Sequence, residues 1–455
     1  MEERGRRSEE PLEGKTTMKT PSFPSVSTKQ QRIAELARQI PDEPLTNLSH
    51  NIDEAWLREA WRRTRKDGAA GIDGQTAQEY EVNLGENLRS LLNRAKSGRY
   101  KAPPVRRVHI PKGRDKTRPI GIPTIEDRVL QRAVLMVLEP VYEQAFLPNS
   151  FGFRPGRSAH DALEALWQGT MEWGGGWLLE VDIQSFFDTL DHTHLRKMLH
   201  SRVRDGVLLR LIGKWLKAGV LEKGAISRSS SGTPQGGVIS PLLANVYLHE
   251  VLDTWLTTLL AQRRHGPARF VRYADDFVLL FRNEEDAQRV FAELPGRFEK
   301  YGLKLHPAKT RLIEFRQPPY RQQDRPRVSF DFLGFTLYWG RSRKGGWILK
   351  RRTAKASLTR SLGQIRRWCR RNRHSPVREQ HRILSAKLRG HYAYFGLTGN
   401  SEALQRFRQE VQRIWCKWLA RRRGRTSRAW DRFRRLTERY PLPPIQVVHS
   451  IYRTQ

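Results

Sequence analysis

The chain of 455 residues contains very little cysteine and has no long apolar run. Its two cysteines, Cys369 and Cys416, are too few for a disulfide framework or a Cys-rich zinc module, so we expect no zinc. No stretch approaches the roughly 20 apolar residues of a membrane span, and the N-terminus, 1–15, is charged where a signal peptide would be apolar. These absences predict a protein of the reducing cytoplasm that does not enter a membrane.

Acidic residues are also scarce, above all in the last part of the chain. Lys and Arg number 83 against 47 Asp and Glu, a net charge of +36. Residues 341–455 hold 31 basic and 5 acidic residues, which is +26 of that total. A mild excess of basic residues would indicate only a solvated basic face. In this region, however, the acidic residues are too few to neutralise the basic ones. A long nucleic acid offers the matching phosphates.

Among the few carboxylates, three form a pattern that indicates metal chemistry. Asp275 and Asp276 stand between two short apolar runs, 270–273 and 277–281, which predicts the tip of a β-hairpin. Such a pair alone is more often a solvated turn. Asp182 closes another apolar strand and adds a third carboxylate. Three carboxylates from two central strands suit two Mg²⁺ ions roughly 3.5 to 4 Å apart, the arrangement of polymerase phosphoryl transfer.

The pattern along the chain predicts an α+β architecture. Helical spacing over 33–64 places Trp56 and Trp61 on one face, and the segment 105–123 alternates as a basic hairpin. Ser240, followed by Pro241, is the predicted N-cap of an apolar helix that runs to Leu252. Strands that alternate with helices in this way favour a mixed α+β domain.

The last part of the chain changes to three amphipathic helical stripes, which begin at Leu358, Ile383 and Leu404. Three such helices can bury one another's apolar faces, so we interpret their aromatic residues as core rather than base-stacking platforms. The arginines between them are expected to face outward. Four of these arginines are predicted to bind RNA: Arg366, Arg367, Arg370 and Arg371.

Eight short motifs in a fixed order give the chain a family resemblance. They are Gly71-Ile72-Asp73-Gly74, Ile110-Pro111-Lys112 with Arg118-Pro119-Ile120, Phe151-Gly152-Phe153-Arg154, Val181-Asp182 with Phe186-Phe187, Thr233-Pro234-Gln235-Gly236-Gly237, Tyr273-Ala274-Asp275-Asp276, Gly302-Leu303 and Phe332-Leu333-Gly334. From about residue 65 onward, the chain resembles the bacterial group II intron reverse transcriptases, also called maturases.

The resemblance implies a right-hand polymerase fold of fingers, palm and thumb. We expect a disordered extension at 1–30, a helical fingers extension at 31–100, fingers and palm at 101–340, a helical thumb or maturase domain at 341–420, and a short basic segment at 421–455 that is a candidate for DNA binding.

The resemblance also assigns the metal site. Asp182, Asp275 and Asp276 match the family's catalytic Mg²⁺ ligands, and the backbone carbonyl of Ile183 is an additional one. Two Mg²⁺ ions are implied, with Mn²⁺ as an alternative metal.

Residues around the metal site are assigned to the incoming nucleotide. Lys112 and Arg118 are expected to hold the triphosphate and to stabilise its developing charge. Phe187 stands where the family places an aromatic ring under the sugar, a ring that would clash with a 2′-hydroxyl and so select dNTPs; the adjacent Phe186 leaves a core role open. Gln235 belongs to the loop beneath the new base pair.

Primer and template are assigned to a separate group of positions: Arg154, Gly236, Gly237 and Gly334. Glycines allow the backbone to approach nucleic acid closely. Gly334 matches a hairpin that positions the primer end, although a plain hydrophobic strand would give a similar pattern.

These assignments predict an RNA-directed DNA polymerase that makes cDNA from an intron RNA template, a DNA primer or target DNA, and dNTPs. It would also assist splicing and retrohoming in a bacterial cytoplasm, in association with the nucleoid. The scattered Cys and His residues match no His-Asn-His endonuclease, and His192 and His194 are interpreted as ordinary helix-start residues.

Three alternatives remain. A splicing cofactor with a vestigial polymerase is disfavoured by the intact carboxylates, and an RNA-dependent RNA polymerase by Phe187 and the Tyr273 motif. A host-associated reverse transcriptase, linked to defence, CRISPR or diversity generation, has a similar core. The sequence does not indicate the oligomeric state.

Overall fold

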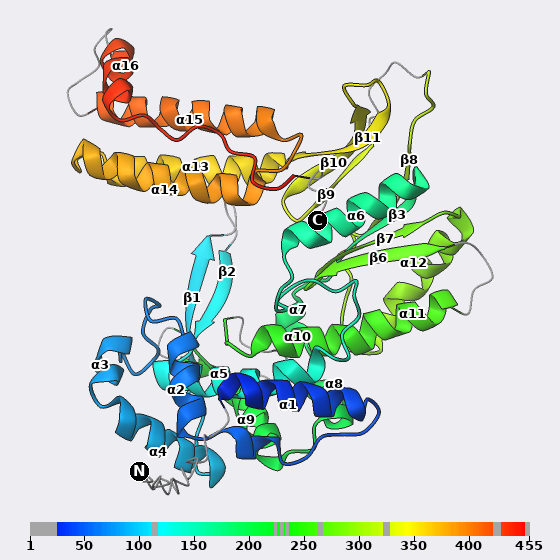
Figure 1. Cartoon of the computed structure of the whole chain (residues 1–455), viewed down its shortest axis with the longest axis vertical. Helices are drawn as coiled ribbons and strands as arrows, with labels where there is room; N and C mark the ends of the chain where they lie inside the picture. The colour runs from blue at the N-terminus through cyan, green and yellow to red at the C-terminus, as the bar shows by residue number, and fades with distance from the viewer. Residues whose placement is uncertain are drawn as a thin grey trace, which may run out of the picture.

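The computed structural model describes residues 25–111, 117–222, 225–227, 232, 236–261, 267–321, 328–421 and 429–450 (Figure 1). These residues form a helical base, a central sheet flanked by helices, a smaller sheet and a bundle of helices toward the C-terminus. The predicted α+β class is confirmed. The base and a small sheet occupy the place of fingers, the central sheet that of the palm and the bundle that of the thumb.

The helical base collects elements from separate parts of the chain. They are α1 (Val26–Gln39), η1 (Leu48–Asn51), α2 (Glu54–Arg63), α3 (Ala77–Val82), α4 (Leu84–Lys96), α5 (Ile125–Tyr142), α8 (His192–Arg202) and α9 (Gly206–Lys217). The small fingers sheet has the order β2-β1-β4-β5, with bounds Thr117–Ile122, Val105–Pro111, Val220–Glu222 and Ala225–Ser227.

Tryptophans of α2 attach the N-terminal helices to α5. The Asp53 side chain caps α2 by accepting a hydrogen bond from the Trp56 backbone N–H at 2.8 Å. Trp56 is fully buried, and its indole N–H donates to the Ala133 carbonyl of α5 at 2.9 Å. Fully burying one large apolar side chain contributes about 1.5 to 3 kcal/mol. The helical spacing of tryptophans thus produces the predicted buried face.

Helix α5 is buried on most sides and carries a buried carboxylate. Asp127 Oδ1 accepts hydrogen bonds from the Tyr100 hydroxyl and the Trp215 indole N–H, both at 2.6 Å. Gln131 donates to Oδ2 at 3.0 Å. Burial raises the pKa of Asp127 to about 6 in spite of these three donors. This network joins α4, α5 and α9 through the loop that carries Tyr100.

The palm is a four-stranded antiparallel sheet of order β6-β7-β3-β8. Its strands are β6 (Ala268–Tyr273), β7 (Asp276–Phe281), β3 (Gly175–Asp182) and β8 (Arg311–Arg316). Alternate residues of β7 face opposite sides: Phe277 and Leu279 belong to one apolar cluster, Val278 and Leu280 to another. The sheet is therefore buried on both faces.

Helices cover the two faces of the palm sheet. Helix α6 (Ala159–Trp173) lies on one face, and α10 (Ser240–Leu248), α11 (Thr254–Ala261) and α12 (Glu284–Glu299) lie on the other side (Figure 1). A π-helical turn, η2 (His249–Asp253), joins α10 to α11. The short helix α7 (Phe186–Thr189) follows β3.

A three-stranded sheet and four helices complete the chain. The sheet order is β11-β10-β9, with bounds Trp347–Thr353, Phe335–Arg341 and Ser329–Phe332. The thumb helices are α13 (Lys355–Arg371), α14 (Val377–Phe395), α15 (Ser401–Ala420) and α16 (Ala429–Arg439). The first three coincide with the predicted stripes, and their apolar faces form one cluster that includes Leu388 and Val411.

Several predicted boundaries need correction. Helix α1 begins at Val26, inside the segment 1–30 for which we predicted disorder; residues 1–24 lie outside the described part. Ser240 is the first residue of α10 rather than its N-cap, which is Ile239. The Ile239 backbone already has helical dihedral angles, φ −86° and ψ −19°, so the helix starts one residue earlier than the Ser-Pro pattern suggests.

The predicted thumb boundaries also shift. The division at 340/341 would cut the β10–β11 hairpin, whose β11 packs on α6 through Leu349; the thumb begins at α13 instead. The segment 421–455 is not separate, because Phe433 and Leu442 are buried in the thumb cluster. Residues 422–428 and 451–455 lie outside the described part. None of the described helices has the length and apolar character required to cross a bilayer.

Candidate active site

The β6–β7 hairpin brings Asp275 and Asp276 to its tip, as predicted. Tyr273 pairs with Asp276, so the turn consists of Ala274 and Asp275 alone. Ala274 has a φ of 56°, in the left-handed region that a non-glycine residue seldom adopts. Tight hairpin turns require positive φ, and the backbone here adopts it at an alanine.

The register of the palm sheet places Asp182 directly opposite Asp276. These residues are the last pair of the antiparallel β3–β7 ladder. Directly opposed residues of antiparallel strands have Cβ atoms about 4.5 to 5.5 Å apart. The register therefore places Asp182 and Asp276 together at one end of the sheet, beside the turn that carries Asp275.

The electrostatics of the site follow from this crowding. The Asp276 side chain is open to solvent, but neighbouring protein atoms and the charges of Asp275 and Asp182 raise its pKa to about 6. The positive charges of Lys309 and Arg118 oppose that rise. Arg118 belongs to β2, so the fingers hairpin and the palm carboxylates lie within electrostatic reach of each other.

Lys309 forms an ion pair with Asp182. Its ammonium group lies 2.6 Å from Asp182 Oδ2, and the Asp182 backbone carbonyl accepts a hydrogen bond from the His306 N–H at 2.8 Å. The loop after α12 therefore holds both ends of this aspartate. An exposed ion pair of this kind contributes only about 0 to 1 kcal/mol, so a competing cation can displace it.

The donor set suits a divalent cation. Carboxylate oxygens are preferred ligands of Mg²⁺, and a bound cation would relieve the carboxylate repulsion that, together with desolvation, raises the pKa of Asp276. Within the part of the chain that the structure describes, no three His, Cys, Asp or Glu side chains already converge on one metal position. The positively charged group beside Asp182 is the Lys309 ammonium group.

The Ile183 carbonyl is placed suitably for the role that the motif assigned to it. Ile183 forms an isolated antiparallel bridge with Leu305. The two hydrogen bonds of this bridge are made by Gln184 N–H to Lys304 O and by His306 N–H to Asp182 O, each at 2.8 Å. The carbonyl of Ile183 is therefore not used by the bridge and points to its other side.

Residues 110–337, about half of the chain, match the family described as reverse transcriptase (RNA-dependent DNA polymerase). The chain belongs to the reverse transcriptase family. Protein YkfC of Escherichia coli (strain K12) is 34% identical over 384 residues, which are 75% of this chain and 97% of YkfC. As a reverse transcriptase, the chain is an RNA-directed DNA polymerase that binds an RNA template and uses a divalent metal ion.

This reverse transcriptase is also homologous to intron-encoded proteins. The group II intron-encoded protein LtrA of Lactococcus lactis subsp. cremoris is 39% identical over 240 residues, 49% of this chain and 39% of LtrA. The resemblance that the motifs predicted is thereby confirmed. A telomerase from Candida albicans matches with a TM-score of 0.41 and 14% identity over 80% of this chain and 67% of that chain, which is too weak to carry an inference.

Among the nucleotide-site predictions, the reverse transcriptase structure separates Phe187 from Phe186. Phe186 is 3% exposed and packs edge-on against Tyr247 in the main core. Phe187 is only partly buried, so its side chain, unlike that of Phe186, is partly open to solvent. Lys112 and Gln235 lie outside the described residues.

Two of the three glycines in the predicted primer and template group, Gly236 and Gly334, adopt a positive φ. Gly236 has a φ of 121°, and an added Cβ would lie 2.4 Å from the Gly121 carbonyl of β2. This glycine therefore permits close packing on the fingers sheet, while the neighbouring Gly237 is partly buried. Gly334, with a φ of 81°, and Leu333, with a φ of 48°, form the two-residue β9–β10 turn.

Arg154 does not fit its predicted role. Its side chain is 3% exposed and binds Glu143 at 2.9 Å. Its guanidinium also donates to the carbonyls of Leu147 at 2.6 Å and Ser150 at 2.8 Å. The prediction that Arg154 contacts primer or template is therefore corrected: its donors are used inside the protein, where they hold the loop before α6.

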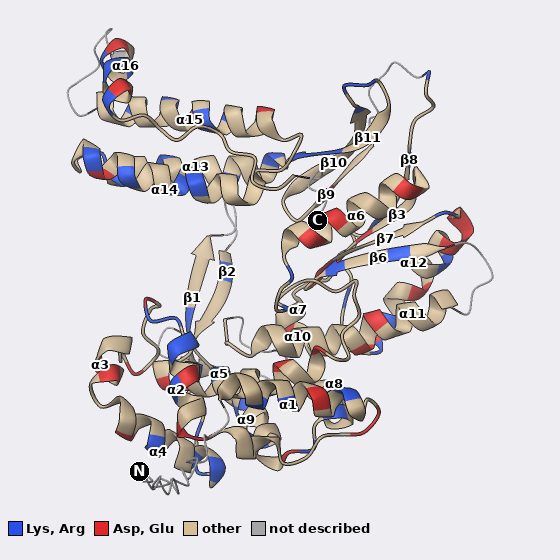
Figure 2. Cartoon of the chain, in the orientation of Figure 1, with Lys and Arg blue, Asp and Glu red and all other residues tan. Residues whose placement is uncertain are grey.

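The four predicted RNA-binding arginines are all exposed on α13. Lys and Arg outnumber Asp and Glu along the thumb helices (Figure 2). Arg370 lines a hollow of about 590 Å³ together with Arg373, Trp418 and Arg421, where Arg421 lies over the Trp418 ring at 4.7 Å. The expected outward direction of these arginines is correct.

Sequence reasoning missed two polar residues of this site. Lys309 carries no motif of its own, and only the tertiary fold brings it to Asp182. Tyr394 lies beside the apolar stripe of α14, and its hydroxyl donates to the Leu333 carbonyl at 2.9 Å. Burial, together with the nearby Tyr273 and Asp276, raises the pKa of Tyr394 to about 12. The sequence signal for Tyr394 was its position on an amphipathic helix, outside the apolar stripe.

Proposed function

We propose that this reverse transcriptase is the polymerase of a group II intron, which copies intron RNA into cDNA from a DNA primer and assists splicing and retrohoming. Its substrates would be dNTPs and its target a DNA strand, in a bacterial cytoplasm close to the nucleoid. The observation that carries the proposal is the register that places Asp182 opposite Asp276 at the tip of the hairpin bearing Asp275.

In this proposal, Asp182, Asp275, Asp276 and the Ile183 carbonyl hold two Mg²⁺ ions, for which Mn²⁺ is an alternative. When bound, the ions activate the primer hydroxyl and neutralise the leaving pyrophosphate. Asp182, which pairs with Lys309, would hold the metal through the same carboxylate. Lys309 would then lie at the rim of the site and keep a positive charge beside the carboxylates.

The remaining site residues orient the nucleotide and the primer. Arg118, with Lys112 from the adjoining turn, neutralises the triphosphate from the fingers side. Phe187 lies under the sugar and excludes a 2′-hydroxyl. The Leu333–Gly334 turn, held by Tyr394, supports the primer end, and Gln235 supports the new base pair with Gly236 and Gly237.

The catalytic part of the proposal is tested by primer extension on an RNA template. Asp275→Ala and Asp182→Ala should each abolish Mg²⁺-dependent extension but retain RNA binding, because each removes a metal ligand rather than a binding surface. Glu314→Ala is the matched control, since Glu314 is an exposed carboxylate on β8 of the same sheet. Near-normal extension by either aspartate variant would contradict the assignment.

For the maturase part, we propose that RNA lies along the basic side of the thumb. A second basic surface adds to the α13 arginines. It is a hollow of about 1270 Å³ between β10–β11 and the first turns of α13 and α15. Its lining includes the basic residues Lys350, Arg352, Lys355 and Arg406 and the acidic residues Glu402 and Glu410. Arg352 lies 4.9 Å over the Tyr338 ring. Cations with an aromatic platform suit a polyanion with bases.

A further inference from the structure

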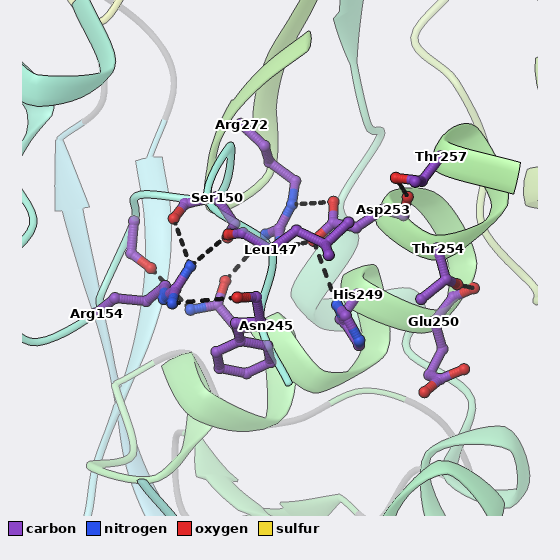
Figure 3. Close-up of polar contacts among 12 residues, drawn as sticks. Leu147, Ser150, Arg154, Asn245, His249, Glu250, Asp253, Thr254, Thr257 and Arg272 are labelled. Carbon is purple, nitrogen blue, oxygen red and sulfur yellow. Dashed lines mark hydrogen bonds and ion pairs between the residues drawn. The ribbon is translucent and has the colours of Figure 1, made fainter. Parts of the chain in front are cut away.

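A fully buried ion pair lies behind the catalytic hairpin (Figure 3). Arg272 Nε donates to Asp253 Oδ1 at 2.8 Å and Nη2 donates to Oδ2 at 2.5 Å, and both side chains have no exposed surface. The charge of Arg272 and a contact from His249 outweigh the effect of burial and keep the pKa of Asp253 below its ordinary value. The pair is thus held charged in the interior.

The third arm of Arg272 reaches the hairpin turn itself. Nη1 donates to the Ala274 carbonyl at 3.2 Å and to Asn245 Oδ1 at 3.0 Å. Ala274 is the residue with a φ of 56°, a left-handed conformation that is unfavourable for a residue with a Cβ atom. The bond to its carbonyl therefore holds an unfavourable turn in place, next to Asp275.

A neighbouring loop is tied to the same network. Asn245 Nδ2 donates to the Gly152 carbonyl at 2.7 Å. The Arg272 backbone binds the same loop, because Phe151 N–H donates to its carbonyl at 2.8 Å and its own N–H donates to Asn149 O at 2.9 Å. A Cβ at Gly152 would lie 2.4 Å from Ala274 N, so this loop packs directly against the turn.

The π-helical turn η2 accounts for how one helix supplies both partners of Arg272. Asn245 and Asp253 are eight residues apart (253 − 245) on the continuous run α10–η2–α11. On a regular α-helix, that spacing would turn the two side chains roughly 80° apart, and the extra residue of a π turn reduces this to roughly 20°. The irregular turn thus aims both side chains at Arg272.

We propose that Arg272, oriented by Asp253 and Asn245, is a positioning residue that fixes the Ala274–Asp275 turn, so that the hairpin carboxylates are presented to metal in one geometry. The inference rests on the proposed catalytic role of Asp275 and Asp276. Stability alone does not account for the pair, because replacing a buried ion pair with apolar residues of similar volume is often neutral or stabilising.

The test separates folding from positioning with the double variant Arg272→Met/Asp253→Leu, which removes both charges and fills the space with apolar atoms. Its melting temperature should stay near that of the wild type. Its kcat for primer extension should fall between about 10- and 100-fold, because the turn loses its anchor, and the Mg²⁺ concentration for half-maximal activity should rise. Full recovery of kcat in the folded double variant would overturn the proposal.

A second, conservative variant, Arg272→Lys, tests the same proposal if the double variant does not fold. Arg272→Lys retains the charge next to Asp253, but one ammonium group cannot bind Asp253, Asn245 and the Ala274 carbonyl in the same geometry. It should fold with a reduced kcat and a raised Mg²⁺ requirement, while the KM for dNTP stays close to wild type. An unchanged kcat and Mg²⁺ requirement would overturn the proposal.

Arg351→Met is the matched control. Arg351 has a side chain 2% exposed and pairs with Glu164 at 3.4 Å, on the contact between β11 and α6. Its loss should lower the melting temperature without changing kcat or the Mg²⁺ requirement of the folded protein; a kcat loss equal to that of Arg272→Lys would contradict a specific role for Arg272. Asp275→Ala in the same assay distinguishes the two proposals, since activity in that variant would refute the catalytic assignment itself.

Discussion

At the scale of single residues, Phe187 differs from its neighbour through a small difference in placement. Both phenylalanines belong to the short helix α7, but Phe186 points into the core and Phe187 remains partly exposed. Substituting Phe186 would remove core packing, at about 3 to 5 kcal/mol for a buried Phe→Ala. Substituting Phe187 should affect the substrate site while the fold is kept.

We therefore expect Phe187→Val to raise ribonucleotide incorporation relative to dNTP by about 10-fold or more, since a smaller side chain leaves room for a 2′-hydroxyl. Competition between dNTP and NTP in single-nucleotide extension measures the ratio. Normal extension with an unchanged ratio would remove the sugar-selecting role from Phe187.

Residue patterns indicated candidate site residues only where acidic side chains interrupt or end an apolar strand. Asp275 and Asp276 were found because a carboxylate pair between apolar strands, joined by a third carboxylate at a strand end, is typical of a metal site. Asp182 supplied that third carboxylate. Arg154 was misassigned because a motif shows that an arginine is present but not that Glu143 uses its donors. Lys309 could not be found, since its contact with Asp182 spans 127 positions of sequence.

At the scale of elements, both functional hairpins could be predicted, but their supports could not. The β6–β7 and β9–β10 turns are short and lie between strongly apolar strands, which is a local signal. The π turn between α10 and α11 leaves no such signal, because it changes the helix phase by one residue within an apolar run. The effect of the π turn is to bring Asn245 and Asp253 to Arg272, a buried charged residue of β6.

Helix α5 allows a prediction about pH and stability. The pKa of Asp127 is about 6 in the folded protein, above its ordinary value of 3.8. Its contribution to stability is therefore fully present below pH 3.8 and is lost as the pH rises through 6. The loss amounts to about 3 kcal/mol, at about 1.4 kcal/mol for each pKa unit.

Asp127→Asn should remove this pH dependence, because the amide cannot ionise and still offers an oxygen to Tyr100 and Trp215. The free energy of unfolding of the variant, relative to wild type, should rise by about 2 to 3 kcal/mol between pH 4 and pH 7. Urea unfolding at several pH values measures this difference. Parallel curves for the two proteins would show that Asp127 titrates normally in the fold.

At the scale of the whole molecule, charge divides the chain in two. The three candidate metal-binding carboxylates lie in the palm, and +26 of the net charge of +36 lies in residues 341–455, where Lys and Arg are frequent along the helices (Figure 2). Composition could predict this division, and the family resemblance could predict the order of the parts. The domain boundaries could not be predicted from sequence. They depend on the fact that β11 is buried in the apolar cluster beside α6, whereas Phe433 is buried in the cluster of the thumb helices.

We expect this division to separate RNA binding from catalysis. Replacing Arg366, Arg367, Arg370 and Arg371 with Gln should weaken intron RNA binding and flatten the slope of log K against log salt by about 0.7 to 0.9 for each lost phosphate contact. Filter binding across a salt series measures both quantities, and the exposed positions should allow normal folding.

The matched control removes the same charge from the palm surface, at the exposed residues Arg282, Arg289, Lys300 and Arg316. Its salt slope should stay closer to wild type, since these cations lie on the palm rather than on the thumb. Equal slopes for the two quadruple variants would mean that net charge alone, and no particular thumb surface, governs the binding of RNA.

We propose that Asp182, Asp275 and Asp276 together hold the divalent metal of this polymerase. Fe²⁺ bound in place of Mg²⁺, with ascorbate and peroxide, cuts the peptide backbone close to the ion and so reports the site without any need for activity. We expect cuts near 182–184 and near 274–276, suppressed by excess Mg²⁺ and lost in Asp275→Ala. Cuts at other places, or cuts at these positions that persist in Asp275→Ala, would contradict it.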